Sequence, residues 1–183
     1  MVTSWSILPQ NDEVIPIATK GKDMHIALEN IQQLRQRGEH EAARRQALEL
    51  LQHQPQHADL HYLAACIHDS LGLEAEAIPH YQQALELGLS GDTAAEAWLG
   101  LGSSHRALGR FDEAETALRE GVQQFPEHHA LRTFLAMALY NRGQHKEATQ
   151  SLLALLADGS ADNGIRAYRR AIRFYAEDLD RTW

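Results

Sequence analysis

Apolar residues recur along most of the chain at spacings of three and four residues, which is the period of an amphipathic helix. The clearest stretch places four packing positions on one helical face: Trp98, Leu101, Gly102 and His105. A second helical stretch follows, with Ala114 and Leu118 on its inner face. Gly109 lies between the two stretches and predicts a tight turn, because glycine tolerates backbone conformations that other residues avoid. Residues 95–128 therefore predict a hairpin of two helices.

The same hairpin pattern occurs four times along the chain. Each copy has a glycine at its turn, and the spacings are 34, 37 and 34 residues between Gly38, Gly72, Gly109 and Gly143. Five residues after each glycine comes an alanine: Ala43, Ala77, Ala114 and Ala148. Repetition at this period is typical of helical solenoids. We therefore predict hairpins at about residues 24–57, 58–94, 95–128 and 129–162.

Prolines and one longer loop separate the hairpins. Pro55 and Pro126 cannot continue a helix, so each is expected to end its hairpin. The longer spacing falls in the sequence "LGLSGDTAA", where Asp92 or Thr93 is expected to cap the next helix.

The third copy has the spacing Trp98-x2-Leu101-Gly102-x2-His105, then Ala114-x3-Leu118 and Pro126, which resembles the tetratricopeptide repeat. It departs from the usual repeat at His105, in place of tyrosine, and at Leu118, in place of phenylalanine. The stretches "HDSLGLEAEAIPHYQQALELGL" and "FLAMALYNRGQHKEA" resemble a bacterial group often called group 5 of these repeats. The resemblance covers nearly everything after Met24. It implies an all-α, right-handed superhelix of four hairpins and no particular activity.

Two segments flank the predicted repeat region 23–162. Residues 163–183 carry one apolar helical face, which predicts a helix that caps the last hairpin: Ile165, Tyr168, Ile172, Tyr175 and Leu179. The other side carries arginines, which we interpret as the solvated side of the cap, with a site for an acidic partner or phosphate as the alternative: Arg166, Arg169, Arg170 and Arg173. Residues 1–22, interrupted by Pro9 and Pro16, predict an extended or flexible arm. Self-association through this arm is kept as an alternative.

Composition limits the classes of partner. The formal charge is -8, with 17 basic and 25 acidic residues, so the overall field repels nucleic acid and anionic membranes. No stretch reaches the roughly 20 apolar residues of a membrane-spanning helix, and we see no signal peptide. The single cysteine, Cys66, excludes an internal disulfide. We expect a cytoplasmic protein without nucleic-acid or membrane partners.

The sequence offers little chemistry. Eleven histidines raise a metal hypothesis, and His57 and His61 have the spacing of two ligands on one helix. The third ligand is uncertain even with His68 nearby, so we expect no metal site and keep a metal- or small-molecule-binding sensor as the alternative function. Adjacent residues on a helix point apart, so Ser103-Ser104-His105 cannot form a catalytic relay. We expect neither an enzyme nor a cofactor.

Binding is expected on the concave side, which the first helix of each hairpin lines. The stripe beside the packing residues faces this groove, and we name its members the inner-face set: Arg35, Tyr62, Asp69, Leu99, Ser103, Arg106, Thr133, Met137, Tyr140 and Asn141. Leu28, Cys66 and Leu99 are the positions that most plausibly complete packing between hairpins. Tyrosine and arginine anchor protein partners well. The sequence therefore predicts a non-enzymatic scaffold that binds a peptide or protein segment.

Overall fold

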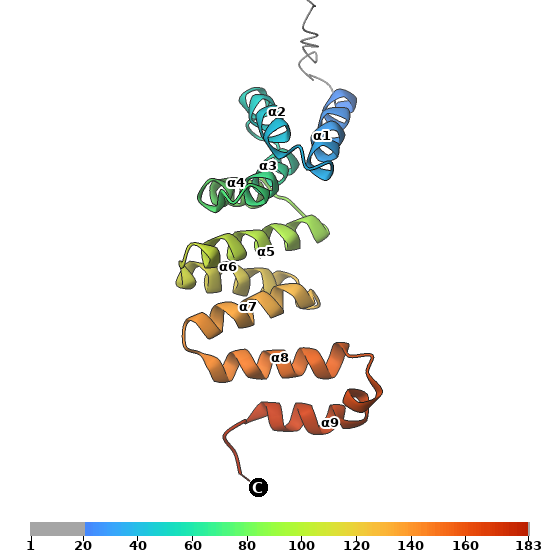
Figure 1. Cartoon of the computed structure of the whole chain (residues 1–183), viewed down its shortest axis with the longest axis vertical. Coiled ribbons are helices and arrows are strands. Elements are labelled where there is room, and N and C mark those ends of the chain that lie inside the picture. The colour runs from blue at the N-terminus through green and yellow to red at the C-terminus, as the bar shows by residue number, and fades with distance from the viewer. Residues whose placement is uncertain (1–20, 183) are drawn as a thin grey trace, which may run out of the picture.

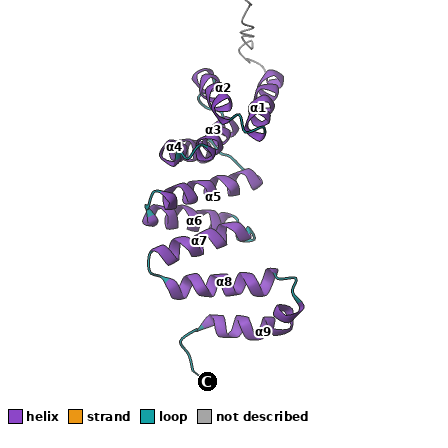
Figure 2. Cartoon of the chain, in the orientation of Figure 1, coloured by secondary structure: helices purple, strands orange, loops and turns teal. Residues whose placement is uncertain are grey.

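The computed structural model describes residues 21–182, and this range is made of helices joined by short turns, without strands (Figure 2). Nine helices follow one another there: α1 (Gly21–Gln36), α2 (His40–His53), α3 (Ala58–Ser70), α4 (Glu74–Glu86), α5 (Gly91–Ala107), α6 (Phe111–Gln124), α7 (His129–Asn141), α8 (His145–Gly159) and α9 (Asn163–Glu177). The predicted all-α class is confirmed.

The first eight helices form four hairpins that stack along the long axis of the molecule (Figure 1). Each helix contacts its neighbours in the chain, and α1, α3, α5 and α7 also contact one another in succession. Within the described range, the backbones of the second helices do not come close to one another. The first helices therefore lie closer together and form the inner row of the array. This arrangement confirms the predicted helical repeat fold.

The hairpin turns depend on glycine. Gly109 has a φ of +73°, a left-handed conformation that other residues rarely adopt, and the other three predicted turn glycines have the same geometry. Just beyond it, the Arg110 N–H donates to the His105 carbonyl at 2.9 Å, which satisfies a carbonyl at the end of α5. The equivalent bond recurs in each turn, so one local motif closes all four hairpins.

Small residues let the two helices of a hairpin approach closely. In the third hairpin, a Cβ atom added to Gly102 would lie 2.4 Å from Cγ of Leu118. A Cβ atom on Gly121 would lie 2.8 Å from Cβ of Trp98. Ala114 and Leu118 are fully buried in this seam. The close approach inferred from the spacing of small residues is therefore confirmed.

Two helix starts differ from the predictions. α5 begins at Gly91, so Asp92 and Thr93 lie inside its first turn. Ser90 occupies the cap position without a side-chain hydrogen bond, so the predicted Asp92 or Thr93 cap was wrong. α1 begins at Gly21, within the predicted arm. The rest of that arm, 1–20, lies outside the described residues, and self-association through it stays a prediction.

The last helix, α9, contacts α8 but not α7. Its contact side is formed by Ile165, Arg169, Ile172 and Ala176. Arg169 donates from Nε to the Ala157 carbonyl at 2.7 Å, and Arg173 pairs with Asp158. Tyr168, which was predicted on the buried face, is 68% exposed. The predicted face was wrong in part: Ile165 and Ile172 do lie on the contact side, but Tyr175 is also exposed, and Leu179 lies exposed beyond the end of the helix.

An ion-pair network joins the second helices of the last two hairpins. Glu115 of α6 is buried, and it accepts hydrogen bonds from Arg119, Arg142 and Gln144. Burial raises the pKa of the Glu115 carboxyl, but the two arginines outweigh it and the net pKa is lowered. Arg119 extends the network by donating to Glu147 of α8 at 2.9 Å. This network ties the outer row together where its helices do not otherwise touch.

Candidate functional site

The inner row carries the residues that the sequence analysis selected. Arg35 lies on α1, Tyr62 and Asp69 on α3, and the other members of the inner-face set on α5 and α7. Because α1, α3, α5 and α7 are in contact in succession, these residues follow one another along one side of the array. They differ in exposure and in what already contacts them. These differences separate residues that hold the helices from residues that are available to a partner.

The most accessible part of the set lies on α5 and α7. Arg106 donates from Nε to Asn141 Oδ1 at 2.9 Å, which links the two helices by an exposed hydrogen bond. Tyr140 is 63% exposed, with its ring centroid 4.7 Å from that of His145. Met137, one turn earlier on α7, is also exposed. An aromatic ring, a thioether and a guanidinium therefore stand at the surface of two neighbouring helices.

Tyr62 on α3 is held more firmly. Its ring lies against that of Tyr81, with centroids 6.3 Å apart, and its side chain belongs to the core between the second and third hairpins. Burial, and then the nearby Cys66 thiol, raise the pKa of Tyr62. Arg35 is half-buried and makes no ion pair with another described residue. The Tyr62 side chain therefore packs against the core and is still partly exposed to solvent.

Asp69 is committed to a network inside the protein. It accepts a hydrogen bond from the Tyr81 hydroxyl at 2.7 Å and from Ser104 Oγ at 2.9 Å. Burial raises the pKa of the Asp69 carboxyl, although these two donors favour the charged form. The three residues come from α3, α4 and α5, so the network joins two hairpins. Asp69 therefore holds α3 and α5 of the inner row against each other.

Tyr81 and Ser104 were missed as part of this site. Tyr81 reaches Asp69 because α5 has Gly100 at the crossing point. A Cβ atom there would lie 2.3 Å from Cζ of the Tyr81 ring. The usable signal was a tyrosine at a repeat position that the other hairpins fill with small or aliphatic residues, namely Ala47, Leu118 and Leu152.

The remaining members of the set are less available. Leu99 packs against the core cluster around Leu131 and Leu135. Ser103 is half-buried, and Thr133 donates from Oγ1 to the His129 carbonyl at 2.9 Å. Leu99 therefore contributes to packing between hairpins, as its position predicted. Ser103 and Thr133 offer small polar groups at the edges of the exposed part.

The histidines of the second hairpin have roles in packing and capping. His57 accepts at Nδ1 from the Leu60 N–H at 3.3 Å and so caps α3. His61 donates from Nε2 to the Pro55 carbonyl at 3.0 Å, so in its neutral form it accepts at Nδ1 from His80, 3.1 Å away. The rings of His68 and His80 are stacked, with centroids 5.2 Å apart. Within residues 21–182, no group of three or more histidine, cysteine, aspartate or glutamate residues could hold a metal ion.

Burial, followed by the charges of His68 and His61, lowers the pKa of His80 to about 4. A neutral ring is therefore part of the folded second hairpin. In the range that the structure describes, we also find no helix that combines the length and the apolar character needed to cross a membrane.

Comparisons with known proteins agree with this architecture. The sequence model of a family described as Tetratrico peptide repeat matches residues 58–179, more than half of the chain. No curated protein matches the chain in sequence. The crystal structure of MamA protein is similar, with a TM-score of 0.69 and 18% identity over 86% of this chain and 88% of MamA. YrrB, described as a TPR protein with an unusual peptide-binding site, gives a TM-score of 0.65 and 21% identity over 85% of this chain and 77% of YrrB.

Proposed function

Because the chain belongs to the tetratricopeptide repeat family, we propose that it is a non-enzymatic scaffold that binds a peptide or protein segment along its inner row. The observation that carries this proposal is the group formed by the half-buried Arg106 on α5 and the exposed Met137, Tyr140 and Asn141 on α7. Tyrosine buries a large area on binding and loses little side-chain entropy, and arginine offers several N–H donors in a fixed planar geometry, so both anchor protein partners well.

The other inner-face residues have supporting roles in this proposal. Asp69 holds α3 against α4 and α5 through Tyr81 and Ser104, which fixes the spacing of the row. Tyr62 and Arg35 extend the surface toward the first hairpin. Because the spacing of the row is already fixed, the scaffold loses little conformational entropy when an extended segment binds. The peptide-binding site described for YrrB, a protein of similar fold, is consistent with this class of function.

The test is a double substitution in the most exposed part, Arg106→Ala with Tyr140→Ala. Peptides are first selected against the full chain from a displayed random library, and their affinities are then measured by fluorescence polarisation. Each anchor contributes about 2 kcal/mol, so the double variant should bind roughly 1,000-fold more weakly. Tyr62 is left intact because it packs against Tyr81 and its loss would disturb the core.

The matched control places the same two residue types elsewhere, as Arg110→Ala with Tyr168→Ala. Arg110 lies in the turn before α6, and Tyr168 is exposed on α9. This control should bind the selected peptides like the wild type. Unchanged affinity in the Arg106 and Tyr140 double variant, with an intact circular dichroism spectrum, would show that binding occurs on another surface.

A further inference from the structure

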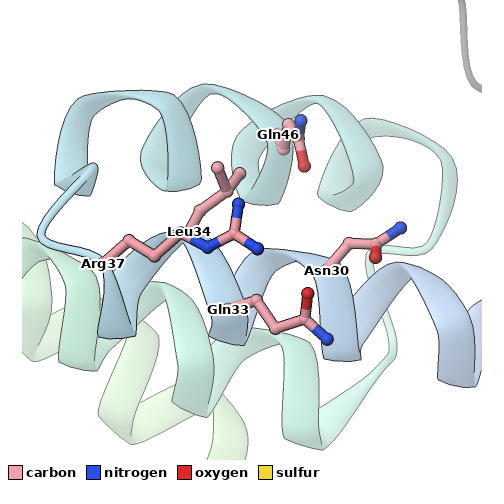
Figure 3. A pocket seen from close by; sticks show the side chains of 5 residues that line it. All are labelled: Asn30, Gln33, Leu34, Arg37 and Gln46. Carbon is pink, nitrogen blue, oxygen red and sulfur yellow. The ribbon is translucent and has the colours of Figure 1, made fainter.

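A pocket opens between the two helices of the first hairpin, away from the exposed part of the inner row (Figure 3). Its empty volume is about 440 Å³, and it is lined by Asn30, Gln33, Leu34, Arg37 and Gln46. Four of these residues lie three, four and seven positions along from Asn30 or at Asn30 itself, on one side of α1 and its end, and Gln46 lies on α2. The lining therefore combines one guanidinium, three carboxamides and one leucine, without an acidic group.

The polar groups of this pocket have no partner in the described part of the protein. No hydrogen bond or ion pair joins the side chains of Asn30, Gln33, Arg37 or Gln46 to another described residue. In Figure 3 the side chain of Arg37 extends along α1, and the amides of Gln46, Gln33 and Asn30 all lie on one side of its guanidinium. Two arginines of the later hairpins behave differently, since Arg119 of α6 and Arg142 in the turn after α7 are both paired with carboxylates.

The equivalent seam in the later hairpins is filled differently. At the repeat position of Asn30 they have Ala64, Leu101 and Leu135. At the position of Gln46 they have His80, Ala117 and Ser151. The outer side of a terminal hairpin is expected to be polar, because no further repeat covers it. That requirement explains polar side chains here, but not their convergence with an unpaired arginine around one depression.

The charge of the first hairpin opposes an anion less than the charge of the second hairpin does. Residues 24–57 contain four acidic and four basic side chains, whereas residues 58–94 contain six acidic side chains and no lysine or arginine. Within the first hairpin, Glu41 is already paired with Arg44 at 2.9 Å. A negative group that approaches Arg37 therefore meets a locally neutral hairpin in a chain of formal charge -8.

We propose that this pocket binds a carboxylate group. Arg37 presents a planar fork of N–H donors that matches the two oxygens of a carboxylate. The carboxamides of Asn30, Gln33 and Gln46 supply further N–H donors and can accept from an amide N–H next to the carboxylate. Leu34 provides an apolar contact for the adjoining carbon atoms. A peptide C-terminus and an acidic side chain both carry this chemistry.

The test is a titration of the full-length chain, followed by amide NMR shifts of residues 30–46. Three probes are compared: acetyl-Ala-Ala with a free terminal carboxylate, acetyl-aspartate with an amidated main-chain carboxyl, and acetyl-Ala-Ala amide. At least one carboxylate probe should shift these resonances, with a dissociation constant on the order of millimolar for so small a ligand. The amide probe should not shift them. Whichever carboxylate probe binds more tightly identifies the source of the group.

Substitution of the arginine isolates its role. Arg37→Gln should weaken binding about tenfold or more, and Arg37→Lys should fall between this variant and the wild type, because lysine keeps the charge but loses the fork. The matched control is Arg45→Gln, an exposed arginine of the same hairpin that does not line the pocket. Equal shifts with the acid and the amide, no shift with either acid, or binding unaffected by Arg37→Gln would each overturn the proposal.

Discussion

The packing of the fourth hairpin on the third differs from the packing of α9 on the fourth hairpin. In the first case α7 contacts both α6 and α5, and Leu118 of α6 is 0% exposed. In the second case α9 contacts α8 alone, and Leu152, at the same repeat position as Leu118, is 44% exposed. The two leucines share a place in the repeat but not an environment.

This difference shows what a repeat position determines. The side chain at this position is buried only when the following first helix lies against both helices of the preceding hairpin. α9 is helical and apolar on one side, yet it follows α8 without joining the inner row. The packing that joins one hairpin to the next is therefore absent between the fourth hairpin and α9.

Of the changes considered, replacement of Leu118 and of Leu152 should show the largest difference in the free energy of unfolding. Leu118→Ala should lower the free energy of unfolding by about 2–5 kcal/mol, because it removes a fully buried side chain and leaves a cavity. Leu152→Ala should lower it by less than about 1 kcal/mol, because its side chain is already partly in water. Urea unfolding followed by circular dichroism measures both. Equal losses would mean that α9 covers the fourth hairpin as fully as α7 covers the third.

A smaller effect is expected from adding one methyl group to the third hairpin. Gly102→Ala should lower the free energy of unfolding by about 1 kcal/mol, since crowding of Leu118 outweighs the gain in helix propensity. The fourth hairpin already has Ala136 at this repeat position, beside a less buried Leu152. Gly159→Ala is the control, because a Cβ atom there would meet nothing closer than 3.9 Å. The control should be neutral or slightly stabilising, and a loss equal to that of Gly102→Ala would contradict the crowding argument.

The smallest expected effect concerns the pH dependence of stability in the second hairpin. The seam between its helices contains His68 and His80, whereas the equivalent positions of the third hairpin hold His105 and Ala117. The pKa of His80 is lowered to about 4 in the folded protein, against about 6.5 in an unfolded chain. Between these values the unfolded state binds a proton that the folded state does not, so stability falls as pH falls through this window. Wild type should lose roughly 1 kcal/mol more than His80→Ala between pH 7 and pH 4.5, after allowance for partial exposure of the ring.

The measurement is urea unfolding at both pH values, and the exposed His53 provides the control through His53→Ala. This control should lose as much stability as the wild type. If His80→Ala and the wild type lose the same amount, the imidazole of His80 does not limit the acid stability of the hairpin.

Much of the fold was predictable because its determinants are local. The four turn glycines each need a left-handed backbone, and Pro55 and Pro126 each end a hairpin, so the period of the chain can be read directly. The close contact of Gly102 with Leu118 also follows from the repeat, because small and large residues alternate at fixed offsets. Local conformational rules and one repeated packing contact were sufficient for these features.

The parts that were missed depend on residues far apart in the chain. The network of Asp69, Tyr81 and Ser104 joins three helices, and its formation depends on the absence of a side chain at Gly100. No single helical pattern contains that information. The orientation of α9 was missed for a different reason. The sequence shows that α9 has one apolar face, but it does not show that Tyr168 and Tyr175 stay outside the contact with α8, or that Arg169 lies on the contact side and bonds to the Ala157 carbonyl.

The buried Glu115 has a mechanical consequence. A stacked array bends as an elastic rod, and its compliance is set by the contacts that cross from one hairpin to the next. Glu115 makes such a contact, because it accepts hydrogen bonds from Arg142 and Gln144 in the turn of the next hairpin. Because every joint of a stretched array carries the same force, the joint between the third and fourth hairpins should therefore resist opening more than it would without Glu115.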